Sequence, residues 1–425
     1  MNTSPDSAAA PVRAITVLRR GPFARYMAGE TISMLGTWMQ QMAQGWVLAS
    51  LTQSAFTLGL VNFASGIPML LLTLQGGVVA DRYDKRFVII ASLVVQAFLA
   101  VAIGLLVGSG RIEVWHVVVA GVCWGIAAAF EVPAVSAIIP ELVEKREISA
   151  AIAVDRSVFH ATRLAGPALG GWLIGTMGTA SAFYVNAASF SALAFALLTI
   201  RPRPVGTAEE EERRQTGMRE GITYVRRDPP TLAMLMLLAL STIFVSPFFM
   251  IIMPLYSMHV LHLSAAQHGI LMAASGAGAF TGSLFLLSIP QKHRLVILRL
   301  GLVVVACAMI GLGIAQRLGF AVVCLVVLTL GTSTIFGLAN TIVQERAPDY
   351  IRGRVSALAG MSFFGVLPFA GLGVSKLADI LGMRTALLGA AVFYGLFGLI
   401  LLTRFINSGQ GGTPAEGSAS RAESA

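Results

Sequence analysis

Three ionisable side chains lie inside long apolar runs of this sequence. Glu30, Glu131 and Arg163 are each about seven or eight residues from one end of their run, a depth of roughly 10 Å in a helix. Charge in a lipid-facing helix is costly. We therefore expect one of two arrangements: a static Glu131–Arg163 ion pair with Glu30 nearby, or carboxyl groups that exchange a proton during a conformational cycle.

The segments that hold these groups are predicted to be membrane-spanning helices. The chain has 425 residues, of which 56% are hydrophobic and 12% charged, and its mean hydropathy is +0.77. A soluble domain carries roughly a quarter charged residues, whereas runs of about 20 apolar residues match the hydrocarbon core of a bilayer. The runs do not alternate as barrel strands do. The sequence thus predicts an all-α polytopic membrane protein.

Twelve such runs are present, which we interpret as two halves of six transmembrane helices. Of the 30 lysines and arginines, 25 fall in segments on one side of the membrane and three on the other, which places both termini in the cytoplasm. The predicted spans are 23–50, 55–79, 87–108, 116–139, 157–177, 180–200, 231–257, 268–289, 295–316, 319–343, 355–380 and 385–404.

The longest break between the spans divides the chain into regions. Within it, Met218, Ile222 and Val225 share one helical face, which predicts a short amphipathic helix on the inner membrane surface. The predicted regions are a cytoplasmic tail 1–22, a six-helix half 23–200, a linker 201–230, a second half 231–405 and a disordered tail 406–425.

The two halves repeat each other faintly. Gly59 matches Gly269 at an offset of 210, and Gly178 matches Gly382 at an offset of 204. Two six-helix halves that arise from an internal duplication are typical of alternating-access transporters.

Other classes of function find little support in the composition. Cys123, Cys307 and Cys324 lie in apolar runs, without a CxxC pair or a Cys/His cluster, so we expect neither a disulfide framework nor a metal site. The net charge of +9 resides in short loops, which argues against nucleic-acid binding. The sequence has no phosphate-binding GxxxxGK[ST] motif and no nucleophile elbow, so no ATPase, enzyme or cofactor is indicated.

The loop after the second span carries the most specific motif. Its residues Gly77-Val-Val-Ala-Asp81-Arg82-Tyr-Asp-Lys85-Arg86 resemble the signature G-x-x-x-D-R-x-x-R/K-R/K of the major facilitator superfamily. Asp84 departs from the pattern, because the superfamily often has glycine there. Gly121 lies where many drug/proton antiporters of the superfamily carry an arginine.

Further motifs resemble particular branches of that superfamily. Gly166, Pro167, Gly170 and Gly171 form a GPxxGG element like that of the antiporter branches. The stretches 36–40, 186–190 and 352–355 resemble bacterial efflux proteins related to the enterobactin exporter.

The resemblance implies a secondary active transporter in the bacterial cytoplasmic membrane. It would export a small organic molecule, siderophore-like or drug-like, by alternating access and proton antiport, as a monomer in the lipid bilayer. A nutrient importer of the same fold is one alternative, and a non-transporting membrane sensor or scaffold is another. The superfamily also implies that the loop is a conformational latch; alternatively, its basic residues only hold it in the cytosol. The latch residues would be Gly77, Asp81, Arg82, Lys85 and Arg86.

The remaining candidate residues concern packing and substrate. The GPxxGG glycines predict tight helix packing, or a pliable helix that seals an inward cavity. A substrate cavity is expected at mid-depth between the halves, where aromatic side chains would suit an amphiphilic substrate. Its candidate residues are Trp38, Gln41, Gln44, Phe130, Glu131, Phe248 and Phe364.

Overall fold

The structure, a computed structural model, describes residues 14–200, 218–348 and 350–409. Regular structure in these ranges is helical throughout, and each of the twelve predicted spans coincides with a helix or with consecutive helical segments. The all-α polytopic fold is therefore confirmed. The predicted tail 1–22 and linker 201–230 are described only from residues 14 and 218 onwards.

Ten of the described helical segments are long and apolar enough to cross a membrane. The two remaining predicted spans are the helices α2 (Gly21–Leu51) and α6 (Ile148–Met177). Both carry charged residues in their interior, among them Glu30 in α2 and Arg163 in α6.

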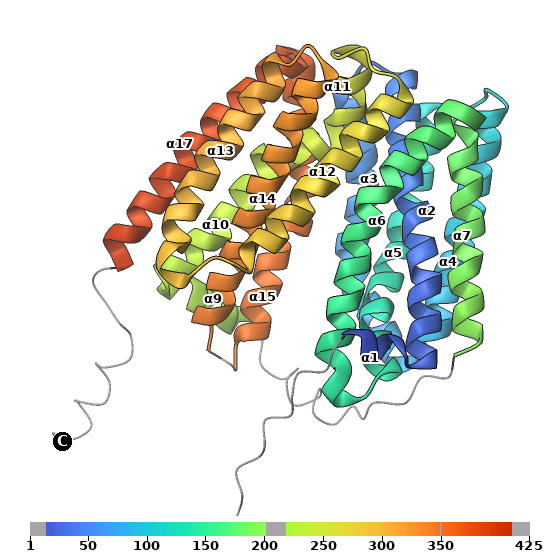
Figure 1. The fold of residues 1–425 in the computed structure, drawn as a ribbon, viewed down its shortest axis with the longest axis horizontal. Helices are drawn as coiled ribbons and strands as arrows, with labels where there is room; N and C mark the ends of the chain where they lie inside the picture. The colour runs from blue at the N-terminus through green and yellow to red at the C-terminus, as the bar shows by residue number, and fades with distance from the viewer. Residues whose placement is uncertain (1–13, 201–217, 349, 410–425) are drawn as a thin grey trace, which may run out of the picture. The chain divides into compact units, whose positions relative to one another are not determined.

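The contacts divide the chain into two units, of which the first holds the helices up to α7 together with Pro254–Gly276. In unit 1, α2 packs against α6 and α7, α4 packs against α5 and α7, and α3 runs along α5 (Figure 1). The other helices of this unit are α1 (Ala14–Leu18), α3 (Ala55–Arg82), α4 (Lys85–Gly108), α5 (Val114–Leu142) and α7 (Ala180–Leu198). The unit also contains α11 (Met253–His259), except for the first residue of that helix.

In unit 2, α13 packs against α14 and α17, and α10 also packs against α14 and α17. The boundary between the units falls within α12 (Ala265–Leu286). The elements of unit 2 are α9 (Met218–Arg227), α10 (Pro229–Phe244), α13 (Arg294–Ile314), α14 (Leu318–Arg346), α15 (Arg352–Gly360), α16 (Leu367–Leu381) and α17 (Met383–Gly409).

A π-helical segment interrupts each of two predicted spans. One segment, Phe248–Ile252, follows Pro247, and the other, Met361–Gly365, ends just before Pro368. Proline has no backbone N–H and cannot continue the regular helical hydrogen bonds, and π-helical turns widen a helix locally. Both spans are therefore irregular along part of their length.

Two helices extend beyond the predicted boundaries. The helix α6 begins at Ile148, well before residue 157, because the stretch between them contains no proline or glycine to end a helix. The helix α17 continues to Gly409, so the first residues of the predicted tail 406–425 are helical. Residues 410–425 lie outside the described part of the chain.

The closest helix crossing of unit 1 joins α3 to α5. A Cβ atom added to Gly76 would lie 2.0 Å from the carbonyl oxygen of Ala129, and one on Gly125 would lie 2.1 Å from that of Ser65. Small residues allow helix backbones to approach in this way in membranes. The neighbouring Gly77 has open space where its Cβ would be.

This crossing predicts opposite effects for two adjacent substitutions. Gly76→Ala should lower the thermal unfolding midpoint of the purified protein, because the new methyl group meets backbone and overpacking costs about 1–3 kcal/mol. Gly77→Ala, the matched control, should leave the midpoint unchanged or raise it, since alanine favours a helix over glycine by roughly 0.5–1 kcal/mol. Equal midpoints for the two variants would contradict the account of the crossing.

Candidate functional site

Three carboxyl groups lie in the interior of unit 1. Glu30 on α2 is 6% exposed, Asp155 on α6 is 8% exposed, and Glu131 on α5 is half-buried. The charges of Glu131 and Asp155 both act on Glu30, and those of all three act on the fully buried Tyr26. We call Glu30, Glu131 and Asp155 the carboxyl cluster.

Hydrogen bonding in the carboxyl cluster is incomplete. The side-chain amide of Gln96, on α4, donates to Glu131. The Oδ1 atom of Asp155 and the hydroxyl of Tyr26 are buried without a hydrogen-bond partner. Among the described residues, none of the three carboxyl groups forms an ion pair with a lysine or an arginine. Within the described part of the chain, the only cationic influence on the cluster is the charge of Arg156, which acts on Asp155 without forming an ion pair.

Arg163 is engaged elsewhere, so the structure does not form the predicted Glu131–Arg163 pair. Its guanidinium lies 5.7 Å from the ring centre of Trp38, a cation–π contact. Arg163 is also about 12 Å further along α6 than Asp155. Depth in the membrane, on which the prediction rested, does not fix the direction in which a side chain points. Arg163 thus contacts Trp38 instead of the predicted partner Glu131.

Two members of this polar region were missed from the sequence. Asp155 lies just before the predicted start of the fifth span and therefore counted as a loop residue, although it lies two turns inside α6. Gln96 is a polar residue in the middle of the third predicted span, and it is 3% exposed. A search for every polar residue within an apolar run, including uncharged ones, would have found Gln96.

The candidate cavity residues differ in their surroundings. In unit 1, Trp38, Gln44 and Phe130 are half-buried and Gln41 is exposed. In unit 2, the two candidates lie in the two π-helical segments. Phe248 is buried at 4% exposure, whereas Phe364 is 62% exposed and packs edge-on against Phe363 with ring centres 5.1 Å apart.

The GPxxGG element lies at two helix crossings within unit 1. A Cβ atom on Gly166 would be 2.4 Å from that of Trp38, and one on Gly170 would be 3.1 Å from the Cα atom of Met39, both on α2. Gly171 faces the other way, where its added Cβ would be 2.9 Å from the Cα atom of Gly269 on α12. The glycines therefore let α6 pack closely on two sides, against α2 and α12, next to the contact of Arg163 with Trp38.

Two motifs that are far apart in the sequence meet between α2 and α7. The side-chain amide of Asn186 donates to Gln40 at 2.8 Å, and the hydroxyl of Ser189 bonds Asn186 at 2.9 Å. A Cβ atom on Gly36 would lie 2.2 Å from the hydroxyl oxygen of Ser189. The stretches 36–40 and 186–190 are thus two sides of one buried polar contact.

The loop between α3 and α4 is built on ion pairs. Asp84 accepts a hydrogen bond from the backbone N–H of Arg86 and caps α4. The hydrogen bonds from the Arg86 side chain also lower the pKa of Asp84. Lys85 pairs with Glu141 at 2.5 Å, and Arg86 also donates to the carbonyl of Ile200 at 2.6 Å. Asp84, the departure from the superfamily pattern, therefore has a structural role.

The other candidate latch residues lie at the C-terminal end of α3. Asp81 and Arg82 are both exposed there. A carboxylate at a helix C-terminus is unfavourable, by about 0.3–1 kcal/mol, because it faces the negative end of the helix dipole.

Comparison with known proteins places this arrangement in context. The chain is 28% identical to an MFS-type transporter, YfiS, of Bacillus subtilis, with 88% of this chain and 91% of that protein covered. It is 24% identical to the staphyloferrin A transporter of Staphylococcus aureus (84% and 90% covered) and 22% identical to the multidrug efflux pump Tap of Mycolicibacterium fortuitum (91% and 96% covered).

Solved structures share the fold. A bacterial homologue of the human lysosomal transporter Spinster, in an inward-facing and occupied conformation, aligns with a TM-score of 0.71 and 16% identity, over 96% of this chain and all of that one. A sequence profile of the transmembrane secretion effectors matches residues 12–411. The match covers almost the whole chain, and the protein therefore belongs to the transmembrane secretion effector family of major facilitator transporters.

Proposed function

We propose that this transporter exports a small organic molecule from the cytoplasm by alternating access, in exchange for protons. The observation that carries the proposal is the carboxyl cluster, two buried acidic groups and a half-buried one that form no ion pair among the described residues. The protein would act as a monomer in the bacterial cytoplasmic membrane, with both termini in the cytoplasm.

The proton-exchange step follows from elementary electrostatics. An ionised carboxyl group in a membrane-embedded helix is costly unless it is paired or hydrated, so its affinity for a proton depends on its surroundings. A change of conformation that opens the cluster to water on one side would release a proton there. The four helices that hold the cluster and Gln96, α2, α4, α5 and α6, belong to one unit, so one conformational change could affect all of its members.

The proposed substrate is siderophore-like or drug-like. Two of the relatives carry such names, the staphyloferrin A transporter and the multidrug efflux pump Tap. The aromatic candidates Trp38, Phe130, Phe248 and Phe364 would offer apolar and π surface to an amphiphilic molecule. Gln41 and Gln44 would add hydrogen-bonding groups.

Export is favoured over two alternatives, a nutrient importer and a non-transporting sensor or scaffold. Relatives named as efflux proteins support export, and the carboxyl cluster would have no evident use in a scaffold. Transport in inverted membrane vesicles separates the three. An exporter accumulates its substrate when a pH gradient, acidic inside, is imposed; an importer loses it, and a scaffold does neither.

The exposed end of α3 is proposed to act as a conformational latch. Asp81 and Arg82 are exposed at the C-terminal end of this helix, where their charges would interact with another element in one conformation of the transport cycle and so stabilise that conformation. Lys85 and Arg86 would hold the loop in place through Glu141, Asp84 and the carbonyl of Ile200.

Neutralising the carboxyl cluster should uncouple transport from the pH gradient. In vesicles, Glu30→Gln, Glu131→Gln and Asp155→Asn should each reduce pH-driven substrate accumulation by about 5- to 150-fold, the range of a coupling free energy of 1–3 kcal/mol. Glu345→Gln, which changes a carboxylate that is 46% exposed in unit 2, is the matched control and should transport normally. Undiminished accumulation by all three cluster variants would refute the coupling role.

Removing the charge of Asp81 should impair transport without harming the fold. Asp81→Asn should insert and purify like the wild type, because the side chain is exposed at the end of α3 and the change keeps its size. Its transport rate should fall at least about fivefold. A normal transport rate would show that the loop serves only to fix the topology.

A further inference from the structure

The short helix α9 lies at the level where three candidate spans of unit 2 end. Its last residue, Arg227, is two positions before the span Pro229–His259. The hydroxyl of Tyr224 donates to the backbone carbonyl of Arg346, the last residue of the span Leu318–Arg346. These contacts place α9 beside the ends of candidate membrane spans.

One side of α9 is fixed to this unit. Glu220 pairs with Arg354, near the start of α15, at 2.5 Å, and an added Cβ on Gly221 would lie 3.0 Å from the Cβ of Arg354. Val225, one turn after Gly221, is 6% exposed. Asp228, directly after α9, pairs with Arg346 at 2.6 Å. The predicted apolar face is therefore only partly right, because Val225 is buried against protein while Ile222 is 39% exposed.

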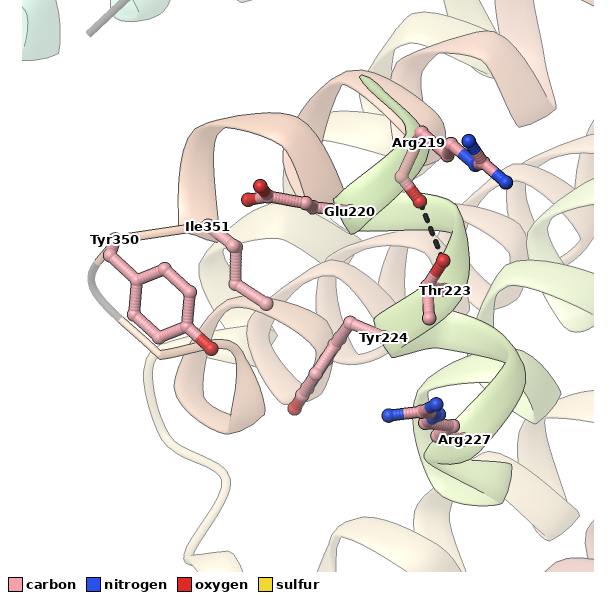
Figure 2. A pocket seen from close by; sticks show the side chains of 7 residues that line it. All are labelled: Arg219, Glu220, Thr223, Tyr224, Arg227, Tyr350 and Ile351. Atoms are coloured by element: carbon pink, nitrogen blue, oxygen red, sulfur yellow. Dashed lines mark hydrogen bonds between the residues drawn. The ribbon is translucent and has the colours of Figure 1, made fainter. Parts of the chain in front are cut away.

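The other side of α9 exposes three arginines and a threonine. Arg219, Thr223, Arg226 and Arg227 are all exposed, and their spacing of three, four and eight residues puts them on adjoining faces. Figure 2 shows Arg219, Thr223 and Arg227 following one another along the helix. We call these four residues the basic face.

The arginines of the basic face differ from other arginines of unit 2 in their ion pairing. Arg294, Arg346 and Arg354 each pair with a carboxylate, whereas Arg219, Arg226 and Arg227 form no ion pair with any carboxylate of the described residues. Arg219, Thr223 and Arg227 also line a pocket of about 820 Å³, together with Glu220, Tyr224, Tyr350 and Ile351 (Figure 2).

We propose that the basic face of α9 binds the headgroups of anionic phospholipids in the cytoplasmic leaflet. A phosphate-bearing headgroup offers negative charge to three arginines that pair with no carboxylate of the described residues, and guanidinium groups and a hydroxyl are suitable donors to phosphate oxygens. The exposed Ile222 adjoins Arg226 at the edge of the basic face and can contact the start of the acyl chains. Basic residues close to a membrane surface each increase the affinity for anionic lipid roughly fivefold.

Because α9 contacts several helices of unit 2, a lipid bound to its basic face would also affect those helices. Through Glu220 and Tyr224 the helix contacts α15 and the end of α14, and through Asp228 it continues into α10. A headgroup bound to the basic face therefore stabilises a point where three spans are tied together, and it acts without any substrate.

The test measures thermal unfolding of the purified full-length protein in detergent, with phosphatidylglycerol added stepwise. The lipid should raise the unfolding midpoint of the wild type, whereas phosphatidylcholine and soluble glycerol 3-phosphate should not. For R219Q/R226Q/R227Q the half-maximal concentration should rise on the order of 100-fold. The variant R219K/R226K/R227K should respond nearly like the wild type, since it keeps the charges.

A matched control removes three arginines elsewhere. Arg19, Arg111 and Arg317 are also exposed, and R19Q/R111Q/R317Q should keep the wild-type response to phosphatidylglycerol. An equal response of wild type and R219Q/R226Q/R227Q would overturn the proposal, as would a control that loses the response to the same extent. If glycerol 3-phosphate reproduces the shift, the basic face binds a soluble phosphate compound and the lipid proposal is wrong. The measurement needs no transport, so its outcome is separate from that of the export proposal.

Discussion

The cost of placing a polar group inside a lipid-embedded helix bundle determines most of this structure. Unpaired polar groups are expensive there, so the buried polar contacts are few and most are paired, as in the Asn186–Gln40 hydrogen bond between α2 and α7. The carboxyl cluster departs from this pattern, because three acidic groups share one region without an ion pair among the described residues. An arrangement that costs stability in one conformation is understandable if another conformation, or a bound proton, relieves it.

Close helix packing provides the framework that holds these groups. Gly76 and Gly125 bring α3 and α5 into backbone contact, and Gly166 and Gly170 do the same for α6 and α2. The same crossings fix the positions of Glu131 on α5 and of Arg163 on α6. The GPxxGG element thus supports the charged region by placing the Arg163–Trp38 contact, although its own residues carry no ionisable group.

Much of the fold could be predicted from the sequence, because a bilayer imposes the length and polarity of each span. All twelve predicted spans coincide with helices of the structure. The directions of side chains could not be predicted, and the Glu131–Arg163 pair was wrong for that reason. Asp155 was missed because the start of α6 depends on the absence of a helix breaker rather than on hydropathy. The π-helical segments around Phe248 and Phe364 also had no clear signal beyond the nearby prolines.

The central claim is that the carboxyl cluster exchanges protons against substrate. The most direct measurement is substrate-induced proton release by the purified transporter in weakly buffered detergent solution, with a transported siderophore or lipophilic cation as the added compound. The account predicts a rise in free protons for the wild type and none for the variant E30Q/E131Q/D155N, provided that both bind the compound. Equal proton release by the two proteins, or none by a wild type that binds the compound, would contradict it.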